Sequence, residues 1–94
     1  MMTREAAERM AIQALSFMAE TPEEFARFLA LSGLDPTSIR AAAADPGFLG
    51  GVLTYLCEEE ARLLAFARHG GIDPADVARA RAALAGPDWE HEHP

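Results

Sequence analysis

The chain has 94 residues, a formal net charge of −7 and a hydrophobic fraction of one half. This length supports one domain, and the apolar content is sufficient for a core, which argues against a disordered chain. All eight basic residues are arginine. The absence of lysine excludes Schiff-base chemistry and a phosphate-binding loop of the lysine-containing type.

The sequence indicates a cytoplasmic protein that does not enter a membrane. No apolar run approaches the roughly 20 residues that a transmembrane helix needs. The first residues carry Arg4, Glu5, Glu8 and Arg9 at helical spacing, so we expect no signal peptide. The single Cys57 cannot form an internal disulfide, which fits a reducing compartment.

The first two helices are predicted from their apolar spacing and their start signals. Residues 3–19 form the first helix, whose apolar stripe is Ala7, Ala11, Ala14, Leu15 and Met18. The second begins at Thr21, a predicted N-cap, with Pro22 at the first helical position and Glu24 completing a capping box. We expect this helix to end at Gly33. Its predicted buried residues are Phe25, Phe28 and Leu29.

Three Asp-Pro steps predict the starts of further helices. Asp35-Pro36 begins a short helix with Ile39, Ala42 and Ala43 inside, and Asp45-Pro46 begins one whose apolar side is Phe48, Leu49, Val52, Leu53 and Leu56. Residues 58–68 are also helical and end at Gly70-Gly71. Asp73-Pro74 begins the last helix, which should bury Val77, Ala80 and Leu84 and end at Gly86-Pro87. Residues 87–94, including Trp89, His91 and His93, are predicted to be a flexible tail.

The chain resembles itself when it is shifted by about 38 residues. This shift aligns residues 15–18 with 53–56 and residues 33–36 with 71–74, without gaps. The break at Thr21-Pro22 then falls on Glu59-Glu60, so we expect two helices rather than one between Pro46 and His69. The resulting prediction is an all-α, compact six-helix domain over residues 1–86, built from two tandem three-helix units, about 10–44 and 48–82. Chance similarity between two alanine-rich stretches is the alternative.

No residue pattern indicates a catalytic, cofactor or metal site. His69 lies in the last turn of its predicted helix, where it complements the helix dipole. Cys57 and His69 are roughly 18 Å apart along a helix, too far for a catalytic pair. The acidic run Glu58–Glu60 is explained by a helix start, and the histidines of the tail have no preorganised geometry for a metal. We therefore expect a protein that is not an enzyme.

A helix-turn-helix protein acting on DNA is the alternative function. The steps around Gly33-Leu34-Asp35 and Gly71-Ile72 have the required spacing of small and apolar residues. The same spacing describes any two helices that are joined by a turn containing glycine. The acidic chain offers few cations for phosphate contacts, so we expect no nucleic-acid partner.

The sequence resembles a small bacterial family that is catalogued as domain of unknown function 3572. The resemblance rests on the run from Phe28 to Pro36, on residues 44–49, and on Leu64-Ala65-Phe66 followed by residues 71–74. It covers nearly the whole chain except the tail. It implies a compact all-helical fold in a bacterial cytosol, and it implies no activity or site residue.

One surface is a candidate for binding. On the helix after Asp45-Pro46, the large side chains fill one arc, and the opposite arc consists of Gly47, Gly50, Gly51 and Thr54. Adjacent glycines inside a helix cost roughly 1 kcal/mol each relative to alanine, which suggests a close approach by another element. That element is either another helix of the chain or a second molecule, and a solvated face is the third possibility. The favoured hypothesis is a non-enzymatic module that binds itself or another protein.

Overall fold

The computed structural model describes residues 2–92, and it describes the side chains of residues 2–35 and 37–84. Every regular element in these residues is helical, which confirms the predicted all-α fold with six α-helices. A short 3₁₀ helix, η1, precedes α3. The elements are α1 (Arg4–Ala19), α2 (Pro22–Ser32), η1 (Pro36–Ser38), α3 (Ile39–Ala42), α4 (Pro46–Cys57), α5 (Glu60–Gly70) and α6 (Pro74–Glu92).

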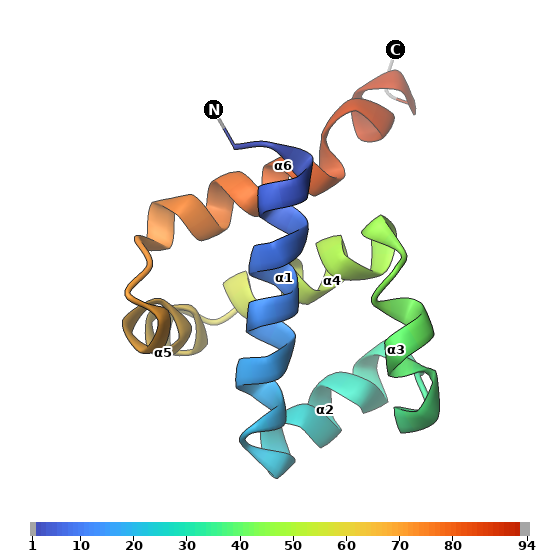
Figure 1. Cartoon of the computed structure of the whole chain (residues 1–94), viewed down its shortest axis with the longest axis vertical. Helices are drawn as coiled ribbons and strands as arrows, with labels where there is room; N and C mark the ends of the chain where they lie inside the picture. The colour runs from blue at the N-terminus through green and yellow to red at the C-terminus, as the bar shows by residue number, and fades with distance from the viewer. Residues whose placement is uncertain (1, 93–94) are drawn as a thin grey trace.

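The core lies where α1, α4 and α6 cross. Figure 1 shows α1 along the long axis, with α4 and α6 passing behind it, and these three helices make the most extensive contacts with one another. Small side chains on α1 allow this close crossing, because Ala7, Ala11 and Ala14 are fully buried. The predicted buried stripes of α1 and α6 are confirmed. The buried residues of α4 are Leu49, Val52, Leu53, Tyr55 and Leu56.

Most helix boundaries follow the predicted signals. The Asp45 carboxylate accepts a hydrogen bond from the Gly47 amide at 2.9 Å, and Asp73 accepts one from Ala75 at the same distance. At the other ends, α2 and α5 stop at Gly33 and Gly71, whose φ angles of 72° and 63° are left-handed. A residue with a Cβ atom is strained in this conformation, and this explains why glycine ends both helices.

The predicted capping box at the start of α2 is wrong. Thr21 occupies the N-cap position and Pro22 begins the helix, but the Thr21 side chain makes no capping hydrogen bond. The Glu24 carboxylate, which would complete the box, instead binds Tyr55 and Arg62. These tertiary partners outcompete the local backbone amide because one of them carries a full positive charge.

The predicted end of the last helix at Gly86-Pro87 is also wrong, because α6 continues to Glu92. Proline has a φ angle compatible with a helix, so it can lie inside one at the cost of a hydrogen bond and a kink. The red, C-terminal part of α6 runs in a different direction from its orange part (Figure 1). The side chains of Trp89 and His91, and the whole of His93, lie outside the described residues.

The predicted break near Glu59 is confirmed, because α4 ends at Cys57 and α5 begins at Glu60. The third helices of the two predicted units differ, since α3 has 4 residues and α6 has 19. The coarse all-helical architecture is therefore established, and the equivalence of the two halves stays a prediction. No described helix combines the length and apolar character that crossing a membrane requires.

Candidate docking groove between α2 and α4

A groove of about 420 Å³ lies between α2 and α4. It is open to solvent along its length, and most of its surface is carbon. The two helices run in roughly opposite directions beside it, because Phe28 of α2 contacts both Tyr55 and Phe48 of α4, while Glu24 reaches only Tyr55. The lining residues are Phe28, Leu31, Ser32, Phe48, Gly51, Thr54, Tyr55 and Glu58.

Aromatic packing forms the base of the groove. The ring of Phe28 is 4 % exposed, and its centre lies 5.2 Å from that of Tyr55 in an edge-on arrangement. The centre of the Phe48 ring is 5.8 Å from that of Phe28. Such tilted aromatic pairs add a favourable term of about 0.5–1.5 kcal/mol beyond burial. The base of the groove is therefore preformed and rigid.

Leu31 makes the rim of the groove apolar. Its side chain is 70 % exposed, the largest exposed fraction among the large hydrophobic residues that the structure describes. A single exposed leucine is ordinary on a protein surface. Here it adjoins an apolar groove rather than a polar face, and this combination is typical of a surface that a partner covers.

Gly51 leaves the centre of the groove open. A Cβ atom built on Gly51 would meet no other atom within 4 Å. One turn further along α4, the Thr54 hydroxyl donates a hydrogen bond to the Gly50 carbonyl at 3.0 Å. This local bond leaves the methyl group of Thr54 as the part available for apolar contact.

The four residues predicted as one surface on α4 do not share one environment. Gly51 and Thr54 line the groove. Gly50 faces α6, because its Cβ position would lie 3.5 Å from the Leu84 Cβ. Gly47 lies beside the capping carboxylate of Asp45. Consecutive helix positions are turned by about 100°, so Gly50 and Gly51 meet different neighbours.

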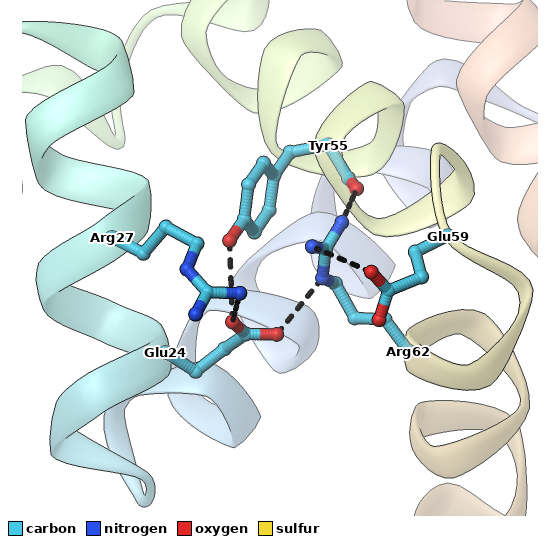
Figure 2. A network of polar contacts seen from close by, with 5 residues as sticks. All are labelled: Glu24, Arg27, Tyr55, Glu59 and Arg62. Carbon is cyan, nitrogen blue, oxygen red and sulfur yellow. Dashed lines mark hydrogen bonds and ion pairs between the residues drawn. The ribbon is translucent and has the colours of Figure 1, made fainter.

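A network of polar contacts centred on Arg62 of α5 supports one wall of the groove (Figure 2). The Arg62 side chain is 8 % exposed, and its Nε donates a hydrogen bond to Glu24 at 2.8 Å. Its guanidinium also donates to the Tyr55 backbone carbonyl and stacks 3.9 Å from the centre of the Tyr55 ring. The Tyr55 hydroxyl donates to the other Glu24 oxygen at 3.2 Å. Three helices are thus joined through one buried cation.

The position of Tyr55 in this network affects its acidity. Burial raises the pKa of the Tyr55 hydroxyl above its ordinary value of 10.0, and the Glu24 carboxylate adds to the rise, while Arg62 opposes it. The neutral hydroxyl can donate to Glu24, and its ionised form would repel that carboxylate. The wall of the groove therefore depends on a protonated Tyr55.

Sequence reasoning did not identify this network. Its one visible signal is the spacing of Glu24 and Arg62, which are 38 residues apart, the same offset that aligns the chain with itself. A duplicated helix pair that packs against its copy brings equivalent positions together, and opposite charges at such positions can pair. The candidate residues named from sequence did not include Tyr55 as a hydrogen-bonding group.

A second cleft, of about 340 Å³, lies between α1 and α5. Phe17 lies between Phe66 and His69, with ring centres 5.6 Å and 4.9 Å away. His69 is in the last turn of α5, as predicted, and its Nε2 is 3.9 Å from a Glu20 oxygen. This half-exposed histidine has an aromatic neighbour and an acidic neighbour but no adjacent nucleophile among the lining residues.

Cys57 lies at the end of α4 and is half-buried. Burial raises the pKa of its thiol above the ordinary value of 9.0, and the nearby Arg81 opposes part of this rise. A thiol with a raised pKa is a weaker source of the reactive thiolate. Within the described residues, no three His, Cys, Asp or Glu side chains gather at a distance suitable for a metal ion.

Comparison with known families identifies the chain. A family model described as protein of unknown function (DUF3572) matches residues 4–87. The chain belongs to the DUF3572 family. The match covers α1 to α5 and the first part of α6, so the groove and the Arg62 network both lie inside the DUF3572 region. The predicted resemblance is confirmed. No curated protein and no solved structure is significantly similar to the chain.

Proposed function

We propose that this DUF3572 protein is a non-enzymatic interaction module that binds a segment of another protein in the α2–α4 groove. The observation that carries the proposal is an apolar, preformed groove that is open at Gly51 and bordered by the exposed Leu31. A groove between two helices is a common binding surface for an amphipathic segment, whose apolar side chains enter it.

The chemistry of the lining supports binding rather than catalysis. The Ser32 hydroxyl donates to the Leu29 carbonyl at 3.1 Å, and the Thr54 hydroxyl donates to the Gly50 carbonyl. Both hydroxyls are thus engaged by their own helices. A nucleophilic hydroxyl would need an adjacent base, and Glu58, the acidic residue of the lining, makes no hydrogen bond with either hydroxyl in the described region.

Two features of the sequence support a setting for this function. We place the protein in the cytoplasm of a bacterium, on the basis of its single Cys57 and of the composition discussed above. The tandem arrangement of two three-helix units, about 10–44 and 48–82, is part of the same proposal. The pairing of Glu24 with Arg62 at the alignment offset supports it.

A random-peptide display selection tests the proposed function. The wild-type protein and the Gly51→Leu variant are compared, because the leucine side chain would enter the groove without meeting another atom of the fold. Gly51→Ala is the matched control, since its methyl group fills little of the groove. We expect peptides that bind the wild type and Gly51→Ala but not Gly51→Leu. Equal enrichment on all three proteins, or enrichment on none, would refute the proposal.

A further inference from the structure

We infer that the segment recognised by the groove belongs to a partner protein and carries an apolar side chain followed by an arginine or lysine. This inference rests on the proposed function and names the partner's chemistry. The apolar side chain lies over Gly51, between Leu31 and Phe48, and the cation lies at the Glu58 end.

The acidic end of the groove is the basis for the cation. Glu58 lines the groove at the C-terminal end of α4, and no basic residue lies in the last turn of that helix. The helix dipole places partial negative charge at the same end. No ion pair within the described residues uses Glu58. A bound cation would therefore meet an unpaired carboxylate and the negative end of a helix.

The neighbouring arginines do not cancel this charge, because each already has acidic partners. Arg62 pairs with Glu24 at 2.8 Å and with Glu59 at 3.8 Å. Arg27 lies 3.8 Å from Glu24. Across the network, two arginines face two glutamates, and Glu58 remains as the excess charge of this region (Figure 2 shows the paired groups).

The spacing along α4 sets the length of the recognised segment. Gly51 and Glu58 are seven residues apart, which corresponds to about 10 Å along a helix at 1.5 Å per residue. A partner helix covers this distance in about two turns, and an extended segment covers it in about three residues. The selected peptides should therefore place the cation at one of these two separations from the apolar anchor.

The sequences and affinities of the selected peptides test the inference. Peptides that require an open groove should carry Arg or Lys at the stated separation. Glu58→Arg should weaken their binding about fivefold to tenfold, and replacing the peptide cation with Glu should restore binding to this variant. Glu60→Arg is the matched control, because it makes the same charge change outside the groove lining and should leave the affinity within about twofold.

Three outcomes would overturn the inference. Selected peptides without a preferred cation would refute the partner chemistry, yet the docking function would stand if Gly51→Leu still abolished binding. Equal losses in Glu58→Arg and Glu60→Arg would show general attraction to an acidic protein. Sedimentation equilibrium that shows a wild-type dimer, dissociated by Gly51→Leu, would make a second copy of the chain the occupant instead.

Discussion

At the scale of single residues, Tyr55 connects the stability of the fold to the shape of the groove. Its ring forms part of the groove lining, and its hydroxyl and backbone carbonyl both belong to the network around Arg62. Removing a partner from such a network leaves a poorly solvated charge, which is more costly than the loss of an exposed ion pair. The groove and the network are therefore coupled through one side chain.

The raised pKa of Tyr55 predicts a loss of stability at alkaline pH. The unfolded chain ionises its tyrosine near the ordinary value of 10.0, while the folded chain keeps the proton to a higher pH. The stabilising contribution is thus complete below pH 10 and is lost as the pH rises from there to the raised pKa. Because the chain has one tyrosine, the tyrosinate absorbance reports this group alone. A midpoint at or below pH 10 in the folded protein would contradict the burial of the hydroxyl.

Two threonines at helix starts have opposite expected sensitivities. The Thr3 hydroxyl accepts a hydrogen bond from the Ala6 amide at 3.1 Å, whereas the Thr21 side chain makes no capping bond. Thr3→Ala should lower the free energy of unfolding by about 0.5–2 kcal/mol, and Thr21→Ala should change it by less than about 0.5 kcal/mol. Urea melts of the two variants measure the difference. A larger loss for Thr21→Ala would show that the capping box forms after all.

At the scale of the elements, the helix boundaries show what sequence alone can predict. Asp-Pro starts and glycine ends are local signals, because each acts on backbone groups within a few residues. They correctly placed the starts of α4 and α6 and the ends of α2 and α5. Glu24 broke this pattern because its choice between a local amide and distant partners depends on tertiary packing. The end of α6 was missed because proline is disfavoured, but not forbidden, inside a helix.

Glycine positions in and after helices should respond with opposite signs to alanine. Gly51 lies inside α4 with no atom near its Cβ position, so Gly51→Ala should raise the free energy of unfolding by about 0.5–1 kcal/mol. Gly33 ends α2 with a φ angle of 72°, so Gly33→Ala should lower it by about 1–2 kcal/mol. Chemical denaturation measures both changes. Destabilisation by Gly51→Ala would show that another element occupies this position in solution.

At the scale of the whole molecule, the charge distribution predicts that the protein does not bind duplex DNA. The net charge is −7, and phosphate contacts supply most of the affinity of DNA-binding proteins. On α6, Arg79 already pairs with Asp76 at 2.6 Å. Fluorescence anisotropy with random-sequence duplexes at physiological salt should show no sub-micromolar binding. Tight binding that weakens steeply with added salt would favour the helix-turn-helix alternative.

Part of the groove was visible in the sequence, and part required the fold. Gly51 and Thr54 were found because glycine is unfavourable inside a helix, which marks the position whatever it faces. The contribution of α2 was not visible, since Phe28 and Leu31 follow the ordinary apolar spacing of any amphipathic helix. Only the packing of α2 against α4 shows that one of these side chains is buried and the other exposed.

The amide spectrum of the ¹⁵N-labelled protein provides the most direct test of docking between α2 and α4. A peptide selected on the wild type would be titrated into the labelled protein at constant pH and salt. We predict that the shift changes cluster on Leu31, Ser32, Gly51, Thr54 and Tyr55, and that they vanish in Gly51→Leu. Changes that instead centre on Phe17 and His69, in the cleft between α1 and α5, would contradict the assignment of the groove as the binding surface.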